Sequence, residues 1–205
     1  SILDNSDARE RVDVEVDTTS AVGGSGNGGS LVYLGDGAAF DGEDGDAVPG
    51  GVSFSVENQY ASEVTITDVT VLPENGALTG LSDKGPGYGY GRSELAVSNG
   101  VQTESVDVPL VADEYTYVGA RGLTLSLAQN RTEDVYDTGA GAFVTAEANA
   151  SGAVTLSPNG TAQVSFAEFY TGATTAAPTA ATATNEDFKV LVNYALNGKT
   201  ISDEY

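Results

Sequence analysis

The stretch FKVLVNYAL, residues 188–196, places a large apolar side chain at every second position. That period is typical of a β-strand with one buried face. Weaker apolar runs occur at 31–34, 142–149 and 152–157. Six further runs show the same period clearly: Val12 to Val16, Val52 to Val56, Val64 to Ile66, Val106 to Leu110, Leu123 to Leu127, and Val164 to Phe166. We therefore expect about ten strands.

Turn-forming residues separate these runs, and no amphipathic helix of ten residues stands out. Close spacing of short strands predicts an all-β chain, a jelly-roll or immunoglobulin-like β-sandwich. In the stretch VTITDVTV, residues 64–71, the apolar phase shifts by one after Ile66. The shift predicts a β-bulge near Thr67 and Asp68.

The composition excludes several classes of function. Of 205 residues, 30 are Asp or Glu and 8 are Lys or Arg, which gives a formal net charge of −22. Such a charge repels nucleic acid and anionic lipid, so no nucleic-acid partner is expected. At molar salt the Debye length falls to about 3 Å and the self-repulsion is screened. The acidity is typical of a protein from a salt-loving organism.

Cys, His, Met and Trp are all absent. Thiol chemistry, Ser-His-Asp hydrolysis, imidazole metal sites and haem ligation each need one of these residues. A carboxylate pair for glycoside hydrolysis cannot be singled out among 30 acids. We therefore expect that the protein is not an enzyme and has no catalytic residues.

The chain begins at Ser1 and contains no apolar segment long enough to cross a bilayer. We interpret it as a mature, exported chain whose signal peptide has been removed, located outside the cell or at its surface without membrane insertion. Three units are predicted: an N-terminal strand segment at 1–20, a Gly-rich tether at 21–30 and a β-sandwich at 31–205. The tether AVGGSGNGGS has a random-coil reach of about 18 Å.

Three other features of the sequence suggest sites or surfaces. Gly24, Gly26 and Gly29 have the spacing of a dinucleotide fingerprint, but a strand follows them and no helix, so we interpret them as linker. The uncharged segment 171–184 is expected to be a long surface loop, or else to be covered by a neighbouring subunit. Sequons for N-glycosylation begin at Asn130, Asn149 and Asn159.

An acidic, Gly-rich loop is the one candidate metal site. Hard cations such as Ca²⁺ prefer several carboxylate oxygens on a loop that can bend toward one point. The spacing is not that of an EF-hand, and a solvated turn is the other interpretation. If a cofactor is bound, we expect it to be a Ca²⁺ ion, and its candidate ligands are Asp36, Asp41, Glu43, Asp44 and Asp46.

Residues 11–17, RVDVEVD, alternate valine with charge, and the tether separates them from the rest of the chain. Such a strand can pair with its own sheet or fill an open edge of the next subunit, by strand addition. In the second case donor and acceptor surfaces differ, so the contact is head-to-tail and forms a filament.

The order of features resembles the secreted TasA/camelysin-type proteins and their archaeal surface relatives. The similarity lies in the Val-alternating first strand, the Gly-rich stretch with Tyr33-Leu34, the run FSVEN at 54–58 leading into VTITDVTV, and LSPNG at 156–160 leading into Val164-Ser165-Phe166. It implies a jelly-roll subunit of extracellular, biofilm-type fibres, with Val12, Val14 and Val16 as donor positions. The extreme acidity and the 171–184 segment depart from that pattern.

The sequence thus predicts a structural subunit that polymerises with itself. Two alternatives remain open. One is a monomeric secreted binding module that uses loops around Tyr88 and Tyr90; the other is a capsid or spike protein of a virus infecting a halophile.

Overall fold

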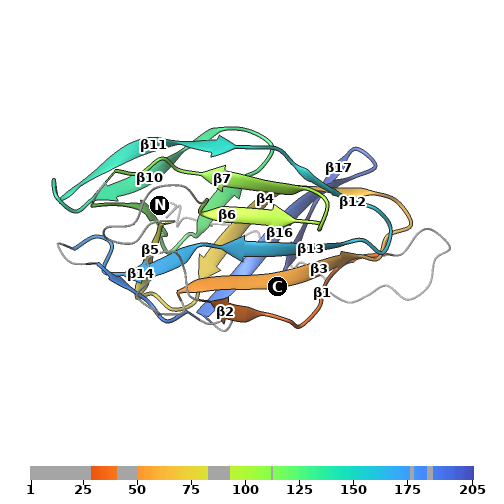
Figure 1. Cartoon of the computed structure of the whole chain (residues 1–205), viewed down its shortest axis with the longest axis horizontal. Coiled ribbons are helices and arrows are strands. Elements are labelled where there is room, and N and C mark those ends of the chain that lie inside the picture. Colours follow the sequence, from red (N-terminus) through yellow and green to blue (C-terminus); the bar gives the residue numbers. More distant parts are fainter. Residues whose placement is uncertain (1–28, 41–49, 83–92, 112, 176–177, 184–186) are drawn as a thin grey trace, which may run out of the picture.

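The computed structural model describes residues 29–40, 50–82, 93–111, 113–175, 178–183 and 187–205. Within these ranges the chain forms seventeen strands and no α-helix. All strand pairs are antiparallel, and they make two sheets that pack face to face (Figure 1). The predicted all-β sandwich is confirmed.

The larger sheet has twelve strands in the order β1-β3-β13-β6-β7-β11-β10-β8-β5-β14-β15, with β2 paired to β3. Its strands are β1 (Leu31–Tyr33), β2 (Ala38–Phe40), β3 (Gly51–Asn58), β5 (Leu78–Ser82), β6 (Leu95–Ser98), β7 (Thr103–Asp107), β8 (Glu114–Tyr117), β10 (Arg131–Asp137), β11 (Ala142–Ala150), β13 (Thr161–Phe166), β14 (Glu168–Thr171) and β15 (Thr179–Ala180).

The smaller sheet has five strands in the order β12-β4-β16-β17, with β9 also paired to β4. They are β4 (Val64–Pro73), β9 (Leu123–Ser126), β12 (Val154–Leu156), β16 (Phe188–Leu196) and β17 (Lys199–Glu204). The described chain has more strands than the ten or so expected, because several are only two or three residues long and the run through Ala167 is split into β13 and β14.

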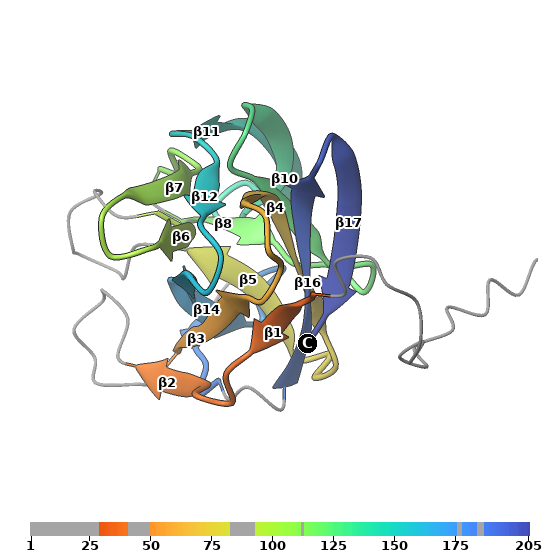
Figure 2. The same ribbon diagram turned by 90° about the vertical axis from the view of Figure 1, so that its right-hand side faces the viewer.

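The larger sheet curls around the smaller one (Figure 2). At the corner between β13 and β14, the Ala167 amide donates to the Glu94 carbonyl at 3.0 Å. Beyond it, the Phe169 amide donates to the Gly50 carbonyl at 2.9 Å. These bonds bring β14 back beside the start of β3, so the larger sheet partly closes on itself.

The core lies between the sheets and contains the apolar residues that the period-2 pattern singles out. Val56, Ile66, Val164 and Val192 are all fully buried. Because successive side chains of a strand point to opposite faces, the polar residues between them face outward. Burial of these side chains is the main force that holds the sheets together.

The β-bulge predicted in β4 is present. In the pairing with β16, Asn193 lies opposite Asp68 and Tyr194 lies opposite Ile66, so no residue of β16 lies opposite Thr67 in the register. The Thr67 carbonyl instead accepts the Leu127 amide at 2.8 Å. The extra residue allows both Ile66 and Val69 to face the core, which strict alternation would forbid.

Over the part that the structure describes, the segment 171–184 lies at the surface, with Thr174, Thr175, Thr179 and Thr182 exposed, but it also packs against its own sheet. Ala173, Ala181 and Ala183 are buried by the chain itself. Ala173 packs in a small cluster with Tyr115 and Tyr170 on the outer side of the larger sheet. Small, uncharged side chains let the segment lie close against its own sheet.

Candidate functional site

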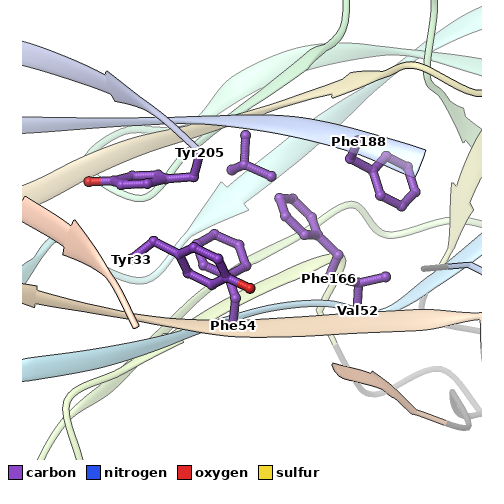
Figure 3. Close-up of a pocket in the computed structure, with 7 residues that line it drawn as sticks. Tyr33, Val52, Phe54, Phe166, Phe188 and Tyr205 are labelled. Atoms are coloured by element: carbon purple, nitrogen blue, oxygen red, sulfur yellow. The ribbon is translucent and has the colours of Figure 1, made fainter. Parts of the chain in front are cut away.

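An apolar cavity of about 110 Å³ lies between the two sheets. Figure 3 shows its lining, with Tyr33 and Tyr205 toward one end and Phe188 toward the other. The seven residues that line it are Tyr33, Val52, Phe54, Phe166, Phe188, Val190 and Tyr205.

Strand alternation explains why these side chains meet. Val52 and Phe54 lie two residues apart on β3, and Phe166 lies opposite Val52 on the neighbouring β13. Phe188 and Val190 are likewise two residues apart on β16 of the smaller sheet. Side chains spaced by two residues share a face, so both sheets present apolar groups to the same space.

Two half-buried tyrosines form the rim of the cavity. The Tyr33 ring lies edge-on to the Phe54 ring at 6.1 Å between centroids, and the Tyr205 ring lies 6.4 Å from that of Tyr33. The Tyr205 hydroxyl donates to the Leu31 carbonyl at 2.7 Å, while the Tyr33 hydroxyl accepts the Gly37 amide at 3.0 Å. Hydrogen bonds therefore hold both tyrosine side chains of the rim in place.

Tyr205 also joins the smaller sheet. Its amide and carbonyl exchange two hydrogen bonds of 2.9 Å with Val190. Burial raises the pKa of the Tyr205 hydroxyl, and the nearby Asp203 and Tyr60 raise it further. The Tyr205 hydroxyl therefore stays protonated over the physiological pH range.

Such a cavity can bind an apolar group but offers no chemistry. Among the described residues that line it, none is a carboxylate or a basic side chain. Dry cavities of about 150 Å³ lined by Leu, Ile and Phe take up benzene, so a space somewhat smaller suits one aliphatic side chain. Filling it adds buried apolar contact on both sheets.

A second, polar cleft lies where β9 and β10 diverge, and its volume is about 530 Å³. Arg131 projects into it and donates to Asp68 of β4 at 3.0 Å. Glu133 follows on the same face of β10. Burial raises the pKa of Glu133 to about 7, with Arg131 lowering it and Asp134 raising it.

The donor positions Val12, Val14 and Val16 lie outside the described residues. So do Asp41, Glu43, Asp44 and Asp46, four of the five candidate Ca²⁺ ligands. Asp36 is exposed, and its carboxylate accepts the Ser55 amide at 2.7 Å, which ties the turn between β1 and β2 to β3. Hydrogen bonds from Ser55 lower the pKa of Asp36. Over the described ranges, no group of three or more possible metal ligands comes together. The calcium site stays a prediction.

The three sequon asparagines are all exposed. Asn130 precedes β10, where its side chain accepts the Ala150 amide and donates to Glu147, both at 3.0 Å. Asn149 lies on β11, and Asn159 lies in the turn between β12 and β13 with φ of 61°. Exposure is compatible with glycosylation, which stays a prediction.

The sequence identified most of the cavity's residues as buried strand positions but not their convergence. Period-2 runs contain Val52, Phe54, Phe166, Phe188 and Val190. Nothing in the pattern indicates that β3 and β16 leave space between them at this end. Tyr205 lies beyond every run that we interpreted as a strand, so no pattern in the sequence indicates its place on the rim.

Comparison with protein-family models, with curated proteins and with solved structures gives no match. No helix capable of crossing a bilayer occurs in the part of the chain that the structure describes.

Proposed function

We propose that the chain is the structural subunit of an extracellular filament that polymerises head-to-tail by strand donation. In this proposal the N-terminal strand of one copy binds the next copy, and a valine from it fills the inter-sheet cavity. The observation that carries the proposal is the apolar cavity between the sheets, with Tyr33 and Tyr205 at its rim.

The chemistry of donor and acceptor supports this pairing. Val12, Val14 and Val16 present a purely aliphatic face, and the described residues that line the cavity are aliphatic or aromatic. The acidic residues between the valines fall on the opposite face of an extended strand. A bound strand therefore buries valine while its charges remain in solvent, where they cost little.

The place of the tether supports it as well. The Gly-rich stretch leads directly into β1, and Tyr33 of β1 forms part of the rim. A strand tethered beside a cavity can fill it in its own chain or in a neighbour. Exchange of such an element between identical copies is a low-cost route to assembly.

Complementary variants of the full chain test the proposal. Val14→Asp removes one donor side chain and leaves the cavity intact; Val190→Phe fills the cavity from within and leaves the donor intact. At molar salt each variant alone is expected to lose the fibres that the unmodified chain forms, as seen by electron microscopy. In a 1:1 mixture each Val190→Phe chain is expected to donate its strand to one Val14→Asp chain, since only one kind of donor and one kind of acceptor remain functional.

Asp13→Asn is the matched control, because it changes the charged face of the same strand, and it should keep the fibres. Fibres of normal length from Val14→Asp would contradict the proposal. If Val14→Asp merely lowers the melting temperature of a monomer, and the unmodified chain is monomeric too, the strand belongs to its own sandwich.

A further inference from the structure

One long edge of the larger sheet is open. β11 pairs with β10 from Ala142 to Ala148, but it pairs with β7 only at Asn149 and Ala150. On the side away from β10, residues 142–148 therefore have no strand partner among the described residues. Backbone amides and carbonyls on such an edge are available to another strand.

This edge lacks the features that normally protect one. From Thr138 to Ala146 no residue is charged, in a chain with 38 charged residues, and the segment contains no proline. Phe143 is 54% exposed and Val144 is 40% exposed. The edge thus presents apolar side chains on both of its faces.

The other edges of the described sheets are short or charged. β1, β2, β9, β12 and β15 have two to four residues each. The remaining long edge, β17, carries Lys199, Asp203 and Glu204. Short and charged edges are the usual means of preventing edge-to-edge pairing, whereas β11 is nine residues long and has its one charged side chain, Glu147, in its second half.

Phe143 is also held in its exposed position. Its ring packs edge-on between Tyr117 at 5.0 Å and Tyr136 at 4.9 Å. A side chain already fixed by its neighbours loses little conformational entropy when a partner covers it.

We propose that β11 is a docking edge for a second copy of this chain, with the two β11 strands antiparallel about a two-fold axis at Val144. In this register Val144 faces its own counterpart, and Phe143 faces Thr145 of the second copy. The first acid, Glu147, faces Gly141. In this register no like charges lie opposite each other. The pairing therefore brings two strongly acidic copies together without placing acidic side chains against each other. This contact uses the β11 edge and not the inter-sheet cavity proposed above for strand donation, and it does not depend on that donation.

Disulfide trapping tests the register. The chain has no native cysteine, so Val144→Cys gives a single thiol. Opposed residues of an antiparallel pair have Cα atoms about 4.5–5.5 Å apart, within disulfide range. Ser202→Cys on β17 is the control. With mild oxidant at molar salt, Val144→Cys is expected to form covalent dimers at least tenfold faster than Ser202→Cys, and the same should hold in the Val14→Asp background, where strand donation is disabled. Equal rates for the two thiols in both backgrounds would overturn the proposal.

A charge placed on the edge provides the second measurement. Thr145→Lys is exposed and should fold normally, yet it puts a lysine into the pairing as edge strands do when they avoid association. In the Val14→Asp background, sedimentation velocity should show that Thr145→Lys shifts the dimer to monomer, while Ser202→Lys does not. A dimer that survives Thr145→Lys with unchanged affinity would place the contact elsewhere.

Discussion

Asn58 is fully buried and connects two turns. Its side-chain amide donates to the carbonyls of Ser62 at 2.9 Å, Leu156 at 3.0 Å and Ser157 at 3.1 Å. Its side-chain oxygen accepts the Tyr60 amide at 2.9 Å. An amide can satisfy both kinds of partner at once, which explains a buried polar residue at the end of an apolar strand.

Asn58→Asp should lower the free energy of unfolding by on the order of 3 kcal/mol at neutral pH, because a buried carboxylate would face three carbonyl oxygens. Urea unfolding measures the change. Gln59→Glu is the control, since it adds the same charge at an exposed neighbour, and it should change stability by less than about 0.5 kcal/mol. If Asn58→Asp lowered the free energy of unfolding by no more than Gln59→Glu does, the hydrogen bonds of Asn58 would contribute little to stability.

Glu133 makes stability depend on pH. Burial raises the pKa of its carboxyl to about 7 from an ordinary value of 4.5. Above pH 4.5 the carboxyl ionises more readily in the unfolded chain than in the folded chain. The folded state is therefore destabilised increasingly as the pH rises, and the destabilisation reaches its full value above pH 7. Glu133→Gln should therefore raise the free energy of unfolding at pH 8 by about 1 kcal/mol, after allowance for solvent around the half-exposed group.

Below pH 4 the gain from Glu133→Gln should vanish, since both states are then protonated. Denaturant unfolding between pH 4 and pH 8 follows the trend. Glu63→Gln removes a charge from an exposed site and should show no comparable slope. A gain for Glu133→Gln that stays constant with pH would assign it to packing.

At the level of the elements, the segment after β14 packs over a single glycine, Gly80 of β5. A Cβ at Gly80 of β5 would lie 2.5 Å from the Ala173 Cβ, with Tyr170 and Tyr115 also within van der Waals contact. Gly80 thus provides the space in which Ala173 packs on the outer face of the sheet. The absence of charge in 171–184 was visible in the sequence, but the space above Gly80 was not.

Gly80→Ala should destabilise the fold by about 1–3 kcal/mol, because overpacking must push Ala173 away from the sheet. Hydrogen exchange should rise most at the Ala173 amide, which donates to the Thr79 hydroxyl oxygen at 3.0 Å. Gly76→Ala is the matched control, since nothing lies within 4 Å of its added methyl group. Equal protection in both variants would mean that the segment adapts without cost.

Strands with one buried face were predictable, and pairings distant in sequence were not. Alternation located β3, β4, β13 and β16, and the phase shift after Ile66 located the bulge, because both are local consequences of burial. The strands β2 and β15 are too short to show any period. The cavity and the open β11 edge arise from which strands are neighbours, and apolar periodicity carries no information on that.

Across the whole molecule, a net charge of −22 opposes compaction at low salt. Raising NaCl from 0.1 to 1 M should therefore raise the melting temperature, as the Debye length falls from about 10 Å to about 3 Å. Calorimetry measures the shift. A variant with Glu63→Gln and Asp134→Asn, both at exposed positions, should have a higher melting temperature at 0.1 M and a smaller salt response. An unchanged melting temperature at both salt concentrations would mean that ion pairing already balances the charge.

The order of strands in the two sheets also sets when the chain can fold. β3 at residues 51–58 pairs with β13 at residues 161–166, and β4 pairs with β16 near the other end of the described chain. A ribosome adds about 5–20 residues per second, so roughly 5–20 s pass between the synthesis of β3 and that of β13. During that interval Val52, Phe54 and Val56 have no sheet to cover them. Newly made chains therefore pass through a stage in which the central strands are exposed, and both sheets can be completed only after β16 has been synthesised.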